Sequence, residues 1–597
     1  MNISTSIEQL KRWKDKHISD KSFILLISTL VGLIAGLAAV LLKISVHFIH
    51  HQLNSEKYNE NYTQLLYPIL GLLFTVLLAK ALYKESSVGH AISDILYSIS
   101  RKQSIIEKGK TYSRWVTSVI TVGLGGSVGL ESPIVLTGGA IGSNIGRLLS
   151  LDYKQRTLLI GCGIGGAISA IFNAPIGGLI FTIEVILTGL SVSNFIPLLI
   201  ACVSATILSN LLAGDEILFT GFNIVDEIHL SDVPVYIILG VVTGSTALFF
   251  NTFLHKLEHI LEHYNPYMKA LLGGGILSIL IIIAPPIFGE GYIAIEHLLH
   301  KEESELVRRS LVFSDYFTEG WLFLFYMVLV TALKIVASSI TLSAGGSGGT
   351  FAPSMVLGGL AGFVTARALN LLGVAEVSEI NFTLVGMSGV LCGVQYAPLT
   401  AIFLIADITG GYTLFIPLML VSAISYVTVT FFQQDSPHVR ALKERGEYID
   451  DNDEDTKILD RLNINKLIET DLLTVQEDAL LGDLVQVISR SRRNLFPVLN
   501  DKQQLVGIIT LDDVRDVMFD HSKHQTLKVE DLKRLVRAKV RYGEKMQDVM
   551  EKFEKTNAWN LPVVDDEGRY MGVVSKSHIF GVYRKQLIRL NKSWINS

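Results

Sequence analysis

The chain has 597 residues, of which 49% are hydrophobic and only 18% are charged. Soluble domains carry about 25% charged residues, so this composition excludes an ordinary water-soluble enzyme and predicts a membrane protein. The formal net charge of -5 gives no sign of the broad basic surface that nucleic-acid binding needs, and we expect no nucleic-acid partner. The three cysteines, Cys162, Cys202 and Cys392, form no CxxC pair, so neither disulfides nor a metal site is predicted.

The N-terminal segment, residues 1–21, carries five lysine or arginine residues directly ahead of an apolar run over residues 23–42. Basic flanks of membrane spans stay on the cytoplasmic side, so we expect this segment to be cytoplasmic. A cleaved secretory signal is the alternative. The run has the length of a full span, however, and no small-residue cleavage pattern follows it.

Apolar segments continue to residue 433, and glycines interrupt them. A transmembrane helix needs about 20 apolar residues, so the segments of 11 to 16 residues predict half-helices that end inside the membrane domain. Irregular backbone at that depth persists only where protein or a water-filled cavity surrounds it, which predicts a polar cavity at mid-membrane. The segments are 64–83, 114–124, 133–148, 156–170, 175–190, 194–213, 233–255, 268–288, 320–340, 353–373, 381–395, 397–409 and 412–433.

An internal repeat divides the apolar region, residues 22–433, into two halves. Residues 125–142 align without gaps on residues 345–362, with eight identities in eighteen positions and an offset of 220. An Ala-Pro pair followed by an acid nine residues after the proline also occurs twice, at an offset of 223: Ala174-Pro175 with Glu184, and Ala397-Pro398 with Asp407. Duplicated membrane halves, usually inverted, are typical of transporters that bind substrate at the repeat interface.

In both copies a glycine-rich strip leads to a proline, Pro133 or Pro353, that suits the first position of a helix. Ser132 is a competent N-cap for the first of these helices. Helix N-termini present unpaired N–H groups, so two of them facing a cavity favour an anion over Na⁺, K⁺ or Mg²⁺. The alternative is that the glycines only allow close helix packing.

Glu131 stands in the first strip, and an ionisable side chain at membrane depth is a functional hypothesis by default. Its carboxylate can occupy an anion site as a tethered substrate, and it must swing out or accept a proton before an anion passes. The alternative is a carboxylate that only stabilises a helix N-terminus, by about 0.3–1 kcal/mol.

The membrane region resembles the CLC chloride channels and chloride/proton exchangers. The resemblance rests on Gly129 to Pro133, Gly349 to Pro353, Asn173-Ala174-Pro175 with Glu184, and Gly411-Tyr412 to Pro417. It implies an all-α polytopic membrane domain with an inverted repeat, and a homodimer with one pathway in each subunit. It also implies that Glu131 is the external gate, that the backbone amides of Thr350 and Phe351 hold the anion, and that the Tyr412 hydroxyl donates to it.

The sequence departs from the family pattern at three places. His90 stands where the family has an anion-coordinating serine, with Ser86 and Ser87 close by, and Leu130 and Ser132 flank Glu131 in place of arginine and glycine. Val185 occupies the position where exchangers carry an inner proton-transferring glutamate. We therefore expect passive, channel-like chloride conduction. Chloride/proton antiport is the alternative, and fluoride export is a weaker one.

A charged linker, residues 434–464, precedes two βαβ-like units with short β-branched strands at 495–500, 505–510, 561–566 and 571–576. These units, residues 465–523 and 535–590, resemble a tandem pair of CBS domains. The resemblance implies an α/β regulatory region that binds an adenine nucleotide, ATP or AMP, through Thr510 and Asp513. The alternative is a dimerisation or docking module, and no cofactor is required for transport itself.

We therefore expect a multi-pass protein of the cell membrane that moves chloride and similar monovalent anions, with its N-terminus and CBS pair in the cytoplasm. A cation transporter with a CBS sensor is a second class, but the predicted helix starts disfavour it. An enzyme is a third class. The chain contains neither HExxH nor GxxxxGK[ST], and His90 and Glu131 have no obvious nucleophile partner, so we expect no enzymatic activity.

Overall fold

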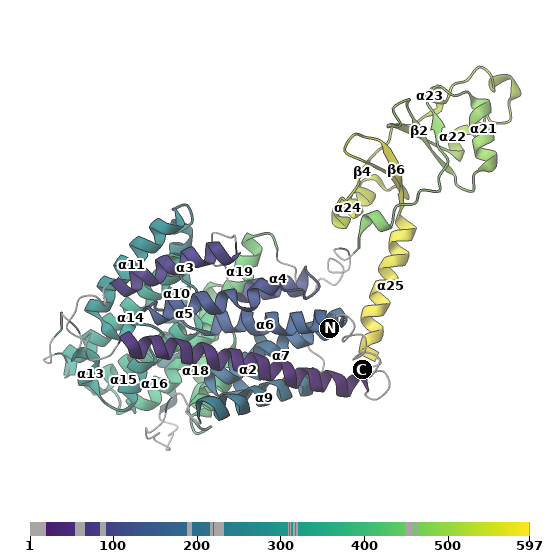
Figure 1. The fold of residues 1–597 in the computed structure, drawn as a ribbon. Helices are drawn as coiled ribbons and strands as arrows, with labels where there is room; N and C mark the ends of the chain where they lie inside the picture. The colour runs from purple at the N-terminus through teal and green to yellow at the C-terminus, as the bar shows by residue number, and fades with distance from the viewer. Residues whose placement is uncertain are drawn as a thin grey trace. The chain divides into compact units, whose positions relative to one another are not determined.

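The computed structural model describes residues 19–53, 66–83, 91–187, 194–214, 219, 232–308, 310, 312, 313, 317, 320–447, 459 and 462–595. The chain divides into two compact units, residues 1–448 and residues 449–597, and each is described by itself. The first unit is helical, and the second contains two small sheets (Figure 1).

The first unit is built of long apolar helices and shorter helices between them. Among the described residues, eight helices are long and apolar enough to cross a membrane. Its α-helices are α2 (Asp20–Leu53), α3 (Tyr67–Tyr83), α4 (Ala91–Ser100), α5 (Ser113–Gly123), α6 (Glu131–Leu148), α7 (Tyr153–Phe172), α8 (Pro175–Phe181), α9 (Phe195–Ala213), α10 (Val233–Leu261), α11 (Pro266–Ile283), α12 (Tyr292–Leu299), α13 (Glu303–Arg308), α14 (Gly320–Ser343), α15 (Phe351–Leu371), α16 (Glu379–Gln395), α17 (Pro398–Ile408), α18 (Phe415–Phe432) and α19 (Pro437–Glu444).

Each apolar segment predicted from the sequence contains a helix, and α8 and α17 are as short as predicted. A π-helical turn over Thr182–Ile186 continues α8. The helices α4, α12, α13 and α19 were not predicted, because they are too short for a span. Helix α19 lies in the first unit and packs on α4, so that residues 437–444 are not part of a linker.

The two repeats meet at equivalent residues. Gly129 and Gly349 exchange both backbone hydrogen bonds, with N–O distances of 3.0 and 2.9 Å, and the pair is antiparallel. The Ser347 amide donates to Thr121 Oγ1 at 3.0 Å, and the Ser127 amide donates to Thr341 Oγ1 at 3.3 Å. The residues involved are equivalent in the two repeats, since Thr121, Ser127 and Gly129 lie 220 residues before Thr341, Ser347 and Gly349. Reciprocal bonds of this kind relate the two halves by a local two-fold axis, as expected for the inverted repeat.

Both glycine strips begin with the same backbone turn. Gly125 and Gly345 have φ angles of 93° and 97°, in a left-handed region that favours glycine. The chain re-enters a helix at Leu130 and Thr350, which are the N-cap residues of α6 and α15. The helices thus start two residues before the positions predicted at Pro133 and Pro353.

The prediction that Ser132 caps α6 is therefore wrong, because Leu130 is the N-cap and Ser132 is the second residue of the helix. Proline is still tolerated at the third helical position, since the first N–H groups of a helix have no intrahelical acceptor.

The alternative role of the glycines, close packing, also occurs in this fold. Helix α6 packs on α7, and its counterpart α15 packs on α16. A Cβ atom at Gly138 would lie 2.2 Å from the Gly163 oxygen, and one at Gly358 would lie 2.3 Å from the Gly386 oxygen. Such contacts let the helix backbones touch, as in other small-residue interfaces of membrane proteins.

The second unit contains two three-stranded sheets of identical topology. In each sheet a two-residue strand runs parallel to the middle strand, which pairs antiparallel with the third. The predicted strands are confirmed to within about two residues. The elements are β1 (Val475–Gln476), α21 (Leu481–Arg490), β2 (Leu495–Leu499), β3 (Leu505–Thr510), α22 (Leu511–Val514), α23 (Val529–Leu532), β4 (Val540–Arg541), α24 (Met546–Thr556), β5 (Asn560–Val564), β6 (Tyr570–Ser575) and α25 (Lys576–Ile595).

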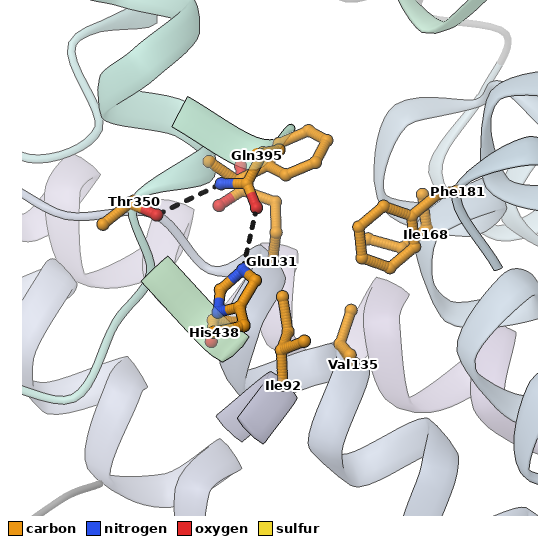
Figure 2. Close-up of a pocket in the computed structure, with 10 residues that line it drawn as sticks. Ile92, Glu131, Val135, Ile168, Phe181, Thr350, Gln395 and His438 are labelled. Atoms are coloured by element: carbon orange, nitrogen blue, oxygen red, sulfur yellow. Dashed lines mark hydrogen bonds between the residues drawn. The ribbon is translucent and has the colours of Figure 1, made fainter. Parts of the chain in front are cut away.

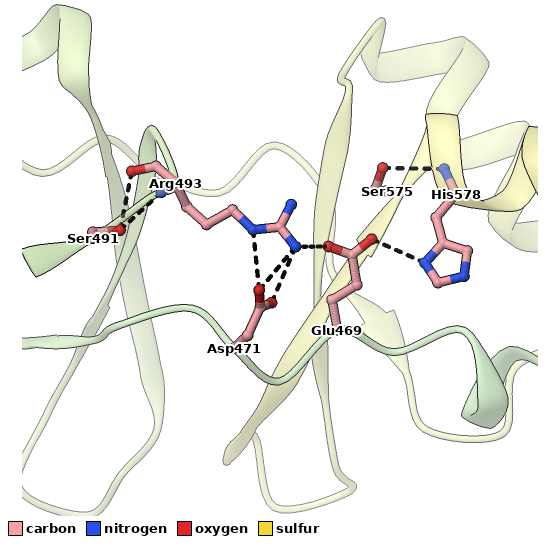
Figure 3. A network of polar contacts seen from close by, with 6 residues as sticks. All are labelled: Glu469, Asp471, Ser491, Arg493, Ser575 and His578. Atoms are coloured by element: carbon pink, nitrogen blue, oxygen red, sulfur yellow. Dashed lines mark hydrogen bonds and ion pairs between the residues drawn. The ribbon is translucent and has the colours of Figure 1, made fainter.

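A polar network joins the two CBS-like repeats inside this unit (Figure 3). The Arg493 guanidinium contacts Asp471 at 3.0 Å and Glu469 at 2.7 Å. Glu469 also lies 3.1 Å from the His578 ring, and its backbone pairs with Val573. The segment that leads into the first repeat is thus bound to the sheet of the second repeat.

Candidate functional site

A narrow pocket lies where the N-termini of α6 and α15 meet (Figure 2). It measures about 20 Å³, which suffices for roughly one water-sized particle. Glu131 is the sole carboxylate among the residues that line it. The lining residues are Ile92, Glu131, Ser132, Val135, Ile168, Phe181, Thr350, Phe351, Gln395 and His438.

The Glu131 side chain is 2% exposed and reaches across to the other repeat. Its Oε2 accepts a hydrogen bond from the Ala352 amide at 3.4 Å, in the first turn of α15. Its Oε1 accepts from the Tyr292 hydroxyl at 3.0 Å. A helix N-terminus favours negative charge, so the carboxylate occupies a place that suits a free anion.

Gly129 makes room for this arrangement. A Cβ atom at Gly129 would lie 1.9 Å from Glu131 Oε2, so the carboxylate rests directly over the glycine. The same Cβ atom would lie 2.8 Å from Ala352 Cβ, so the glycine makes room both for the Glu131 side chain and for the first turn of α15.

A buried lysine that the sequence analysis did not single out holds the segment behind Glu131. Lys334, on α14, is fully buried, and its ammonium group donates to Ser127 Oγ at 2.9 Å. It also donates to the carbonyl oxygens of Gly289 at 3.0 Å and Glu290 at 2.9 Å. The signal was present in the sequence, since an ionisable residue within a predicted span, here 320–340, marks a functional site by default.

Glu290 and Tyr292 connect this anchor to the strip of the first repeat. The Leu130 amide donates to Glu290 Oε1 at 3.4 Å, and Tyr292 donates to Glu131 as described above. We call the segment from Ile287 to Tyr292 the brace. By holding the brace, Lys334 orients the Tyr292 hydroxyl, which donates to the Glu131 carboxylate.

Thr350 and Phe351 lie in the pocket, where the sequence analysis expected them. Two further residues, Gln395 and His438, were missed. The Gln395 side-chain amide donates to Thr350 Oγ1 at 3.1 Å, and its oxygen lies 3.2 Å from His438 Nε2. Gln395 lies two residues before Ala397 of the second Ala-Pro motif, but only the fold brings the end of α16 and the start of α19 to the same pocket.

The structure does not place Tyr412 in this pocket. Its side chain is 48% exposed in the turn before α18, and its hydroxyl donates to Asp407 Oδ1 at 3.3 Å. The expectation of an anion ligand at Tyr412 is therefore not met, because the turn after α17 directs the ring toward the acid of its own repeat. His90 lies outside the described residues.

Val185 sits in the π-helical turn and packs against the apolar core. Its neighbour Glu184 accepts hydrogen bonds from the amides of Leu399 at 3.1 Å and Thr400 at 2.7 Å, at the start of α17. Asp407 does the same for α8, through the amides of residues 176 and 177. The two acids of the repeat thus cap each other's short helices.

In the second unit, Thr510 and Asp513 bond to each other. Asp513 Oδ2 accepts from the Thr510 amide at 2.8 Å and from the Thr510 hydroxyl at 2.7 Å, which caps α22. The other oxygen of Asp513 pairs with Arg534, whose side chain is largely exposed. An exposed guanidinium beside the turn is a group that can bind a phosphate.

Two inverted repeats whose interrupted helices meet around a buried carboxylate define a polytopic membrane transport protein. Residues 71–430 match the family model of the voltage gated chloride channels, and residues 464–520 and 532–585 match the CBS domain model. The chain therefore belongs to the voltage gated chloride channel (CLC) family and carries two CBS domains.

Known relatives include proteins with both channel and exchanger names. The chain is 24% identical over 553 residues to the chloride channel protein CLC-f of Arabidopsis thaliana, covering 82% of this chain and 69% of that protein. It is 22% identical over 413 residues to the H(+)/Cl(-) exchange transporter ClcA of Vibrio parahaemolyticus, covering 66% and 84% respectively. A slow cyanobacterial Cl-/H+ antiporter of known crystal structure shares the fold, with a TM-score of 0.62, 22% identity, and coverage of 71% of this chain and 98% of that chain.

Proposed function

We propose that this protein conducts chloride and similar monovalent anions across the cell membrane through a pathway that Glu131 gates. The observation that carries this proposal is the position of the Glu131 carboxylate, buried at the start of α15 in a pocket with room for about one small particle. An anion can occupy that position only after the side chain has moved away. Protonation of Glu131 would release it, because a neutral acid is held less firmly at a helix N-terminus.

We further propose that conduction is passive. Val185 cannot carry a proton, and the adjacent Glu184 is engaged as a helix cap of α17. Chloride/proton antiport is the second candidate, and the titratable His438 in the same pocket is the observation that favours it.

Reconstitution into liposomes separates the two candidates. Chloride efflux and proton movement are followed together in the wild-type protein and in Glu131→Ala, Val185→Glu and Val185→Gln. We expect efflux without coupled proton uptake in the wild type, and faster efflux in Glu131→Ala. Val185→Glu tests whether a carboxyl at that position introduces coupling, with Val185→Gln as the uncharged control of equal size.

Uphill proton uptake at a fixed ratio to chloride in the wild type would refute passive conduction. Absence of chloride movement in both the wild type and Glu131→Ala would refute the transport function itself.

The assembly that we propose is a homodimer with one pathway per subunit, with the N-terminus and the CBS pair in the cytoplasm. Apolar side chains on α17 and α18, such as Leu399 and Ile416, are 53% and 71% exposed and offer a surface for a second copy. Subunit counting by single-molecule photobleaching tests the dimer, and protease access to the CBS pair in oriented vesicles tests the topology. Monomers, or CBS domains on the outside, would contradict this part.

The CBS pair is proposed to bind ATP or AMP near Thr510, Asp513 and Arg534. Since Asp513 already caps α22, we expect the exposed Arg534 to supply the contact to phosphate. ATP and AMP are titrated against the full-length protein by calorimetry, with Arg534→Ala and, as a control, Arg541→Ala on β4. Equal binding by all three proteins would show that Arg534 does not contact the phosphate, whereas binding by none would leave the pair as a docking or dimerisation module.

A further inference from the structure

The hydrogen-bond chain on one wall of the pocket has a direction that its chemistry determines. The Gln395 amide nitrogen donates to Thr350 Oγ1, so the Gln395 oxygen is an acceptor and His438 Nε2 must carry the proton between them. Figure 2 shows the three side chains in this order. Thr350 Oγ1 accepts at this contact, so its own O–H proton is directed elsewhere.

A polar side chain at position 395 is not a requirement of the fold. Helix α16 ends at Gln395 and is followed by the left-handed residue Tyr396, in the same way that α7 ends at Phe172 and is followed by left-handed Asn173. Phe172, the counterpart of Gln395 in the other repeat, packs its ring on Phe351. Since an apolar ring meets the same backbone geometry there, the amide at Gln395 indicates a function in the pocket.

His438 lies at the start of α19, whose N-terminus is capped by Ser436. Ser93, on α4, donates to the His438 backbone oxygen at 3.1 Å. Among the residues that line the pocket, Glu131 and His438 are the two with ionisable side chains. Histidine is the side chain whose charge changes between about pH 5 and 8.

The charged groups on the elements around His438 are largely engaged with one another. Asp94 on α4 pairs with Lys110 at 2.9 Å and with Arg445 at 3.4 Å. Lys443 on α19 pairs with Asp435 at 2.7 Å. Arg440 is also on α19, while α6, the start of α15 and the end of α16 contribute Glu131, Thr350 and Gln395 to the pocket. With Glu131 removed, His438 is therefore the titratable group that this pocket retains.

We infer that His438 is a second titratable residue of the anion pocket, and that its protonation strengthens anion binding independently of Glu131. The inference rests on the proposed function, because the ligand is the chloride that Glu131 admits. A positive ring at His438 attracts an anion in a space that excludes most of the water, whereas a neutral ring carries no charge to attract it. Anion transport then responds to pH through two groups, the gate and the pocket wall.

The test uses full-length protein in liposomes, with Glu131→Ala as the background so that the gate carboxyl contributes no titration. The chloride dependence of efflux is measured between about pH 5 and 8 for this variant, for Glu131→Ala/His438→Gln and for Glu131→Ala/His297→Gln. His297 pairs with Glu302 outside the pocket and controls for the loss of a histidine. Chloride binding to the same proteins in detergent is measured by calorimetry.

We expect Glu131→Ala to bind chloride about three- to tenfold more tightly at the acidic end of this range than at the basic end. The His297 control should keep that pH dependence, and His438→Gln should abolish it. The inference would be overturned if chloride affinity in Glu131→Ala did not change with pH, or if the pH dependence persisted in Glu131→Ala/His438→Gln. Either result would leave chloride conduction intact. Absence of chloride transport and binding in Glu131→Ala would instead refute the proposed function, and the inference with it.

Discussion

The Tyr292 hydroxyl lies 3.0 Å from Glu131 Oε1 and donates to it, across a separation of 161 residues in the sequence. The donor belongs to the brace that Lys334 holds in place, and the acceptor belongs to the first glycine strip. The position of the proposed gate thus depends on a residue outside both motif copies.

Replacing this donor should loosen the gate. In Tyr292→Phe the carboxylate loses a hydrogen bond to a charged acceptor, which is worth about 1.5–3 kcal/mol, so the open population should rise roughly tenfold or more. Chloride efflux from liposomes measures the change. Tyr326→Phe is the matched control, because that buried hydroxyl donates to the Leu306 oxygen away from the pocket. Unchanged efflux in Tyr292→Phe would show that Tyr292 does not restrain Glu131.

A side chain at position 129 should displace the gate directly. Gly129→Ala places a Cβ atom 1.9 Å from Glu131 Oε2, so the carboxylate must leave its site at the start of α15. We expect efflux to approach that of Glu131→Ala, with little further increase in the double variant. Gly275→Ala, where an added Cβ meets nothing within 4 Å, is the control. Chloride efflux from Gly129→Ala that is slower than in the wild type, and that rises when Glu131 is also replaced by alanine, would contradict this account.

The ammonium of Lys334 should be essential for the stability of the brace. Lys334→Met leaves the carbonyl oxygens of Gly289 and Glu290 without their buried donor. The expected loss is about 3 kcal/mol, seen as a lower thermal unfolding temperature in detergent. Lys80→Met, at an exposed lysine of α3, should change the temperature little. Equal temperatures for the wild type and Lys334→Met would mean that the brace folds without its anchor.

Glu184 and Asp407, which cap α17 and α8 respectively, should contribute similar amounts to the free energy of unfolding. Glu184→Ala removes the acceptor of the first amides of α17, and Asp407→Ala removes that of α8, so each should lower the free energy of unfolding by about 0.5–2 kcal/mol. Glu305→Ala, which removes an exposed pair with Arg308, should cost at most about 1 kcal/mol. Chemical unfolding in detergent compares the three. Proton transport that depends on Glu184 would contradict its assignment as a cap.

Local patterns in the sequence were sufficient to predict the internal repeat and the helix starts that it produces. The matched glycine strips, with the Ala-Pro motifs and their acids, predicted duplicated halves and a carboxylate at a helix start, and both are present. The lengths of the apolar segments predicted half-helices, which is confirmed for α8 and α17 and wrong for α7, since its 20 residues are long enough to cross a membrane. The predicted start positions were two residues late, because proline is compatible with any position in the first turn and does not by itself identify the first one.

The roles of Gln395, His438 and Tyr292 could be identified only from the tertiary structure, whereas Lys334 was visible in the sequence as an ionisable residue within a predicted span but its partners were not. Each gains its role by meeting residues that are far away in the sequence. Tyr412 shows the converse, since a residue in a family-like motif turns toward Asp407 instead of the pocket. The sequence alone determined which backbone segments break inside the membrane, because glycine, proline and apolar length act locally. Which side chains line the resulting pocket was decided by the packing of α4, α16 and α19 around the two helix starts, since a side chain's neighbours there come from distant parts of the chain.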